Sequence, residues 1–188
     1  MNKQEKKKQI IDDTISVCSQ YGFHGTGIDT ITSNTGVSKA TIYKYFHSKE
    51  NLIAEALSTY SQQAIHDLER LFHDKKMTLQ DKLEFYFNKL IYLFENDSFN
   101  GCYFQLAFSE FNLVDKKIGD ICSFYKKKRL ELLINLLEME NISEAKIKAK
   151  KAEIVFNGLL AMLHITKDKE LLLLAKDMYI STAIGSTS

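Results

Sequence analysis

The stretch that says most about the fold is Val37-Ser38-Lys39-Ala40-Thr41-Ile42-Tyr43-Lys44-Tyr45-Phe46-His47-Ser48-Lys49-Glu50-Asn51-Leu52, which begins with the pattern of a short helix. Ser38 is a good helix N-cap, because its hydroxyl can accept a hydrogen bond from a backbone N–H of the first turn. Ile42 and Phe46 are four residues apart, so they share a helix face that can pack on a core. A helix this short is not stable alone in water, so the packing of that face must hold it.

The opposite face of this predicted helix is polar and basic. Lys39, Lys44 and Lys49 supply three positive charges, and residues 38–49 contain no acid. Ser48 can cap a following helix, in which Lys49 would oppose the helix dipole. A bound anion would remove that conflict, and a nucleic-acid phosphate is such an anion. The stretch therefore predicts a surface that binds a polyanion.

The residues upstream predict a partner helix. Thr26 fits the N-cap of a helix over residues 27–35, with Asp29 completing a capping-box pattern. Gly36 stands where a left-handed residue commonly ends a helix. Together with the helix over residues 38–45, this pattern indicates a helix-turn-helix.

A set of motifs also matches a known family pattern: Tyr21-Gly22-Phe23, Thr26 to Ile31, Gly36-Val37-Ser38, Thr41-Ile42-Tyr43 and Tyr45 to Leu52. Over about residues 5–55 the chain resembles the DNA-binding domain of TetR-family transcriptional regulators. Beyond that segment the chain is similar to the family in length and helical layout, not in motif.

The resemblance implies a role for each matched residue. The second helix of the pair would enter the major groove of a double-stranded DNA operator. Phosphate contacts are implied for Thr26, Tyr43, Tyr45 and Lys49. Contacts to bases or to the groove wall are implied for Ser38, Lys39, Ala40, Thr41 and Lys44.

Composition agrees with an all-α chain and limits the alternatives. The 188 residues include no proline, no tryptophan and only eight glycines, which favours helices. A net charge of +1 means that any basic surface is local. Cys18, Cys102 and Cys122 are odd in number and lack metal-binding spacing, so we expect a reducing cytoplasm and no metal or cofactor. No apolar run reaches the length of a membrane span and the lysine-rich start is no signal peptide.

The pattern of apolar residues predicts about nine helices in three segments. Residues 1–48 would form a three-helix DNA-binding domain, 49–72 a connecting helix and 73–188 a helical effector-binding and dimerisation domain. Thr78 with Asp81, then Ser143, and then Asp168 are predicted to cap helices of the last segment.

Aromatic residues concentrate between residues 85 and 125, which hold twelve of the 21 Phe and Tyr residues. They form either a packed aromatic core or a cavity for an apolar or aromatic small molecule. The family resemblance favours the cavity, with Glu110 among its polar groups. The candidate effector-binding residues are Tyr86, Phe87, Tyr103, Gln105, Phe108 and Phe124.

The last two predicted helices are unusually apolar. The run 171–174 is all leucine and covers every side of a helical turn, so one face needs a partner beyond its own core. A two-fold interface between two copies of the chain would bury that face, and it agrees with the four-helix dimer that the resemblance implies. The candidate interface residues are Ile154, Leu159, Leu163, Leu172, Met178 and Tyr179.

These patterns together predict a homodimeric DNA-binding transcriptional regulator, most simply a repressor released from a palindromic operator by a small apolar or aromatic effector. No nucleophile motif, metal spacing or phosphate loop is present, so we do not expect an enzyme. Two alternatives stay open: a helical enzyme, or a protein-binding adaptor that uses the aromatic body.

Overall fold

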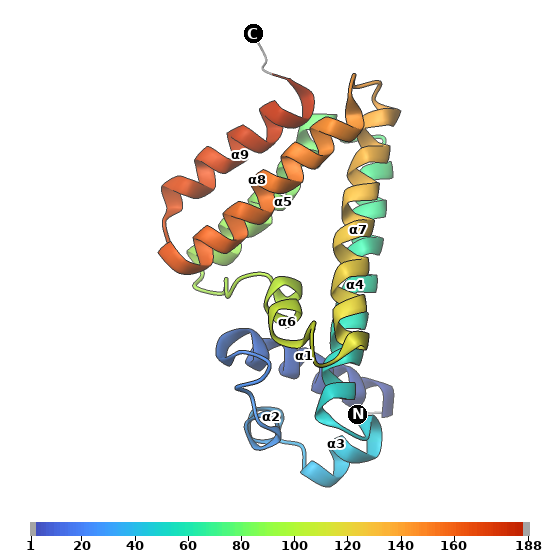
Figure 1. The fold of residues 1–188 in the computed structure, drawn as a ribbon, viewed down its shortest axis with the longest axis vertical. Coiled ribbons are helices and arrows are strands. Elements are labelled where there is room, and N and C mark those ends of the chain that lie inside the picture. Colours follow the sequence, from blue (N-terminus) through green and yellow to red (C-terminus); the bar gives the residue numbers. More distant parts are fainter. Residues whose placement is uncertain (1–2, 186–188) are drawn as a thin grey trace. The chain divides into compact units, whose positions relative to one another are not determined.

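The computed structural model describes residues 3–185, apart from the side chain of Tyr86. Within that range the chain is all helical and has no strand, which confirms the predicted fold class (Figure 1). The helices are α1 (Lys3–Tyr21), α2 (Ile28–Thr35), α3 (Lys39–Phe46), α4 (Lys49–His73), α5 (Leu79–Glu95), α6 (Tyr103–Phe111), α7 (Lys116–Met139), α8 (Ala145–Thr166) and α9 (Lys169–Ile184).

Most helix ends follow the local signals in the sequence. Ser38 caps α3, and Gly36 ends α2 in the left-handed conformation with a φ of 64°. Thr78 and Asp81 form the predicted reciprocal capping box at the start of α5. Asp168 caps α9 by accepting a hydrogen bond from a backbone N–H of its first turn. These four predictions are confirmed.

Two predicted caps are wrong, because the residues concerned take other conformations. Gly27 is the N-cap of α2, and Thr26 instead donates its hydroxyl hydrogen to the carbonyl oxygen of Gly22 at 2.6 Å. At α8 the N-cap is Glu144, in the left-handed conformation with a φ of 57°, and not Ser143. In both cases the first turn of the helix has no side-chain cap.

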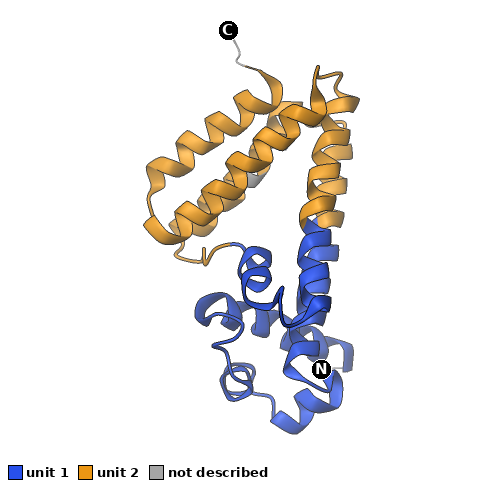
Figure 2. Ribbon diagram, in the orientation of Figure 1, with its two compact units in different colours: residues 1–64, 102–125 blue, residues 65–101, 126–188 orange. Residues whose placement is uncertain are grey.

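The chain divides into two compact units (Figure 2). The first unit contains Met1–Ala64 and Cys102–Tyr125, and the second contains Ile65–Gly101 and Lys126–Ser188. The division falls inside α4 and α7, so each of these helices supplies residues to both units. Helix α6 therefore belongs to the same unit as the N-terminal helices.

The first unit has a core that holds the short helices in place. Helix α1 packs against α2 and α6, and α2 packs against α3. Ile42 and Phe46, the predicted anchors of α3, are 0% and 2% exposed. Other side chains without exposed surface in this core are Ile10, Phe23, Ile31, Leu52, Ile53, Leu57 and Ile118. Burial of these apolar side chains supplies the stability that α3 lacks on its own.

The second unit is built from α5, α8, α9 and parts of α4 and α7. Helix α9 packs along α8 and against α5 (Figure 1). In its core the ring of Phe87 lies with its centroid 5.1 Å from that of Tyr179 and 5.5 Å from that of Phe156. These three rings come from α5, α8 and α9, so they join the three helices.

A buried ion pair also lies inside the second unit. Arg129 of α7 donates from Nε and Nη2 to one carboxylate oxygen of Glu153 of α8, at 3.0 and 2.9 Å. The guanidinium carbon lies 3.8 Å from the centroid of the Phe156 ring, a cation–π contact. Both charged side chains are less than 10% exposed. A buried charge is costly without its partner, so the pair fixes how α7 and α8 pack.

Removal of one partner of this pair should therefore destabilise the protein strongly. We expect Glu153→Ala to lower the free energy of unfolding by about 3–5 kcal/mol, because Arg129 would stay buried without a counter-charge. Glu138→Ala removes an exposed carboxylate from α7 and should change it by no more than about 0.5 kcal/mol. Urea unfolding followed by circular dichroism measures both, and equal small effects would contradict the prediction.

Candidate nucleic-acid interface

Helix α3 presents its polar face to solvent and its apolar face to the core. Ile42 and Phe46 point inward, as described above. The residues predicted to face DNA lie on the remaining surface: Ser38, Lys39, Ala40, Tyr43 and Lys44 are exposed, and Thr41 and Tyr45 are half-buried. The helical period alone produces this separation, because anchors four residues apart occupy one stripe.

The first turn of α3 is held by hydroxyl groups. Ser38 Oγ accepts a hydrogen bond from the backbone N–H of Thr41 at 3.2 Å and lies 3.0 Å from the Thr41 hydroxyl. The N-terminal residues of a recognition helix are those that meet base edges in the major groove. The two hydroxyls are thus ordered at the N-terminal end of α3.

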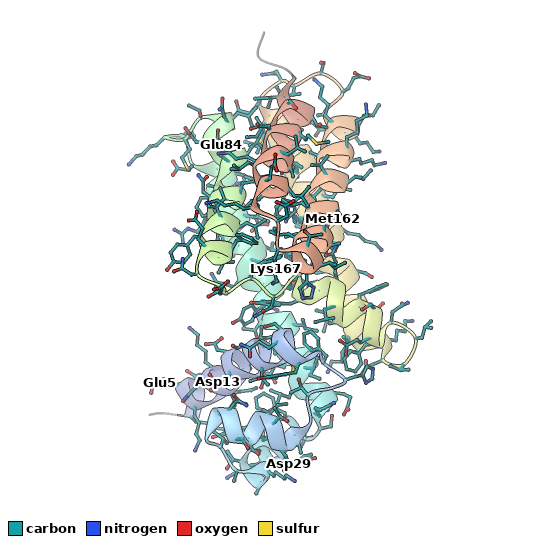
Figure 3. The ribbon with its side chains drawn as sticks, turned by 90° about the vertical axis from the view of Figure 1, so that its left-hand side faces the viewer. Glu5, Asp13, Asp29, Glu84, Met162 and Lys167 are labelled. Carbon is teal, nitrogen blue, oxygen red and sulfur yellow. The ribbon has the colours of Figure 1, made fainter. Side chains whose placement is uncertain are left out.

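The lysines of this face differ in whether a carboxylate of the protein already pairs with them. Lys39 Nζ lies 2.6 Å from a carboxylate oxygen of Asp29 of α2 (Asp29 is labelled in Figure 3). Both side chains are more than half exposed. Exposed pairs of this kind are weak, so a phosphate could replace Asp29. No carboxylate among residues 3–185 forms an ion pair with Lys44. Lys44 is therefore the more available charge.

Lysines of α1 lie over the aromatic end of α3. The Lys3 ammonium is 5.9 Å from the centroid of the Tyr45 ring, and that of Lys7 is 5.4 Å from the centroid of the Phe46 ring. Lys7 also forms an ion pair with Glu55 of α4. These cation–π contacts join the start of α1 to the end of α3.

Two residues expected at phosphates are directed into the protein. Thr26 has no exposed surface, and its hydroxyl is bonded within the loop between α1 and α2. Lys49 Nζ donates to the carbonyl oxygens of Phe23 at 3.3 Å, His24 at 3.5 Å and Thr26 at 3.2 Å. An ammonium group has three donors, so these bonds account for all of them. In this conformation Thr26 and Lys49 stabilise the loop, and their phosphate contacts stay predictions.

Cys18 lies against the same loop. Burial raises the pKa of its thiol to about 11, although a hydrogen bond with Thr26 and the charge of Lys49 oppose the rise. The thiol has no exposed surface and stays protonated near neutral pH. Cys18 is therefore a core residue.

The predicted effector-binding residues do not gather in one unit. Phe87 belongs to the second unit and is fully buried between Phe156 and Tyr179, so its ring is part of a packed core. The first unit contains Tyr103 and Gln105, which are half-buried, and Phe108 and Phe124, which are exposed. The side chain of Tyr86 lies outside the described part of the structure.

Glu110, expected among the polar groups of an effector cavity, has a different place. Its carboxylate accepts hydrogen bonds from the backbone N–H groups of Phe23 and His24. The partners lie more than 80 residues away along the chain. No local signal in the sequence marks such a contact, because the two segments meet only in the folded chain.

The structure corrects the proposed interface residues of α8 and α9. Leu159, Leu163, Leu172 and Tyr179 are at most 4% exposed and belong to the core of the second unit. Ile154 and Met178 are 72% and 48% exposed and stay candidates. Further exposed apolar residues, outside the six candidates, are Met162, Ile165, Leu173 and Leu174 (Figure 3 labels Met162). Both stripes of α8 are apolar, so the sequence alone could not tell which one faces the core.

Comparison with known proteins bears directly on this site. Residues 10–56 match the model of a family described as "Bacterial regulatory proteins, tetR family". The chain is 30% identical over 149 residues to the fatty acid metabolism regulator protein of Bacillus subtilis (strain 168), covering 78% of this chain and 73% of that protein. It is 28% identical over 102 residues to the biofilm operon icaADBC negative transcriptional regulator IcaR of Staphylococcus epidermidis, covering 54% and 53% of the two chains.

The fold is similar to that of solved proteins over almost the whole chain. A TetR transcriptional regulator from Legionella pneumophila superposes with a TM-score of 0.85 at 18% sequence identity, covering 97% of this chain and 98% of the other. At that identity the likeness concerns the fold alone.

The free charge of Lys44 leads to a prediction for DNA binding. We expect Lys44→Ala to weaken binding by about 1–3 kcal/mol and to lower the slope of log affinity against log salt by about 1, because one cation near the DNA is lost. Lys127→Ala, which removes an exposed lysine from the second unit, serves as the control. Fluorescence anisotropy over a salt series measures both variants, and equal losses would contradict a special role for Lys44.

Proposed function

The chain is a transcriptional regulator of the TetR family, and we propose that it is a repressor that binds a palindromic operator as a homodimer and leaves it when a small apolar molecule binds. The proposal extends the family assignment to the mode of regulation, the assembly and the effector. Each of these is supported by a different feature of the chain.

The exposed face of α3 carries the proposal of operator binding. Its solvent side combines Lys39, Lys44, the Tyr43 hydroxyl and the capped hydroxyls of Ser38 and Thr41. Phosphate contacts from such groups position a protein on DNA, and side chains in the groove select the sequence. We propose Ser38, Lys39, Ala40, Thr41, Tyr43, Lys44 and Tyr45 as the residues that meet DNA. The name of IcaR, a negative regulator, favours repression.

Exposed apolar side chains on α8 and α9 support the homodimer. Ile165 is 81% exposed and Ile154 is 72% exposed, both on α8, and Leu174 of α9 is 56% exposed. Exposed apolar surface of this extent commonly marks a protein interface. A two-fold interface would bury the same patch on both copies, and two copies can read the two halves of a palindrome.

An apolar effector agrees with the aromatic residues of the middle of the chain. Tyr103, Gln105, Phe108 and Phe124 are all at least partly exposed, so their side chains have surface that a ligand could cover. The similar Bacillus subtilis protein is a fatty acid metabolism regulator, which makes compounds with acyl chains the first class to screen.

A repressor acts where the chromosome is, so we place the protein in the cytoplasm. None of the helices within residues 3–185 is both long and apolar enough to cross a bilayer. The similar proteins of known role are regulators, and we propose no catalytic activity for this chain.

Selection of bound duplexes from a random DNA pool tests the proposed function. We expect enrichment of a short inverted repeat, because two copies of α3 would meet half-sites related by two-fold symmetry. Affinity for it should fall steeply between a low and a moderate salt concentration, because phosphate contacts release counterions. Failure to enrich any sequence would instead favour the protein-binding adaptor.

The dimer has its own test. Ile165→Glu places a charge in the proposed interface, and we expect it to shift the dimer to monomer and to weaken operator binding by at least about tenfold, because an unpaired charge is costly to bury. Leu113→Glu is the matched control, because Leu113 is 94% exposed in the turn after α6. Sedimentation velocity measures assembly. A variant at position 165 that stays dimeric would exclude this face as the interface.

A further inference from the structure

The loop between α1 and α2 is held on its carbonyl side by Lys49. As described above, the ammonium group donates to the carbonyl oxygens of Phe23, His24 and Thr26. These carbonyls lie in the loop beyond the end of α1 and outside its helical hydrogen bonds. Lys49 thus supplies, from the first residue of α4, hydrogen-bond donors for three loop carbonyls.

The same loop is held on its N–H side by Glu110 of α6. One carboxylate oxygen accepts the backbone N–H of Phe23 at 3.1 Å, and the other accepts that of His24 at 2.5 Å. Hydrogen bonds to ionised groups are stronger than bonds between neutral groups. Phe23 and His24 are therefore bonded to a charged side chain through both their N–H and their carbonyl groups.

Ring contacts from α6 reinforce this arrangement. The His24 imidazole stacks on Phe111 with a centroid distance of 4.4 Å, and its Nε2 atom lies 2.8 Å from the backbone carbonyl oxygen of Glu110. The Phe23 ring is fully buried and meets Phe111 edge to face at 6.5 Å. The end of α6 therefore contacts the loop through side chains and backbone.

The start of the loop fits closely against Glu110. Gly22 has a φ of +81°, a conformation that side chains rarely adopt. A Cβ atom at this position would lie 3.3 Å from Glu110 Oε1, a tight contact. Glycine thus gives the loop both its turn and its close approach to the carboxylate.

The loop leads directly into the helices that carry the DNA-facing residues. It ends at Gly27, which is the N-cap of α2. Because glycine has no side chain, no side-chain hydrogen bond caps the first turn of α2. Helix α2 packs against α3. A change in the loop would therefore alter the first turn of α2 and, through that helix, the position of α3.

We propose that Glu110 and Lys49 are a positioning pair for DNA binding: they fix the α1–α2 loop from opposite sides and so set the position of α3 without touching DNA. The inference rests on the proposed operator binding. It assigns to a residue of α6 an effect on DNA affinity and gives Lys49 a role that does not need a phosphate.

The sign of the effect separates positioning from simple electrostatics. Glu110→Gln removes a negative charge from a protein that binds a polyanion, so electrostatics alone predicts tighter binding. The amide can accept only through its oxygen, and its NH2 group would face a backbone N–H of the loop. Loss of positioning therefore predicts weaker binding.

The experiment uses the full chain and a duplex selected from a random pool by the wild-type protein. We expect Glu110→Gln to weaken binding on the order of tenfold, with an unchanged slope against salt, because no DNA contact is lost. Asp120→Asn also removes one negative charge from the first unit and should change affinity by less than about twofold. Circular dichroism at the assay temperature establishes that each protein is folded. Equal or tighter binding by Glu110→Gln would overturn the proposal.

A second variant keeps the charge. Glu110→Asp is one methylene shorter, so its carboxylate cannot reach both N–H groups, and we expect a loss similar to that of Glu110→Gln. Hydrogen exchange at the Phe23 and His24 amides should become faster in both variants. If Glu110→Asp and Glu110→Gln both bound DNA with wild-type affinity, the proposal would be wrong.

Lys49→Met tests the other half of the pair. A positioning role predicts weaker binding with an unchanged salt slope, whereas a phosphate contact predicts a slope lower by about 1. The double variant Lys49→Met with Glu110→Gln should lose less binding free energy than the two single variants together, because both residues act on one loop. Failure of the wild-type protein to select any duplex would refute operator binding itself; wild-type binding that both single variants retain would refute the positioning pair alone.

Discussion

The recognition surface depends on one constraint, which is that α3 cannot exist without the core beneath it. A helix of eight residues gains too few hydrogen bonds to be stable in water. Ile42 and Phe46 are buried almost completely, and burial of two such side chains contributes roughly 3–6 kcal/mol. Most of the polar face is therefore available for contacts with DNA, because burial of the apolar face is the main contribution that holds the helix in place.

Features that arise between near neighbours in the chain could be predicted from the sequence. The cap of α3 joins Ser38 to Thr41, and the capping box of α5 joins Thr78 to Asp81. In each case the residue type is enough, because the partner is a backbone group three positions away. The all-helical fold and the inward face of α3 follow from the same kind of local information.

Features that arise between distant segments could not be predicted. Lys49 is conspicuous in the sequence because a cation at a helix start is unfavourable, but a phosphate and a cluster of carbonyls satisfy it equally well. Only the fold brings the carbonyls of Phe23, His24 and Thr26 to its ammonium group. Glu110 is hidden for the same reason. On α8 the obstacle is different, since Ile154 and Leu159 are both apolar and the sequence does not say which of them is buried.

The charge of the chain shows why the geometry of α3 matters more than the number of its lysines. With a net charge of +1, the protein has no general attraction for DNA. Three cations near α3 already have partners inside the protein: Lys7 pairs with Glu55, Lys49 bonds the loop, and Lys39 forms a weak, exposed pair with Asp29. Lys39 and Lys44 both lie on α3, so a displacement of this helix would move both charges relative to the DNA. We therefore expect DNA affinity to depend also on the contacts that position α3, such as those of Glu110 and Lys49 with the α1–α2 loop.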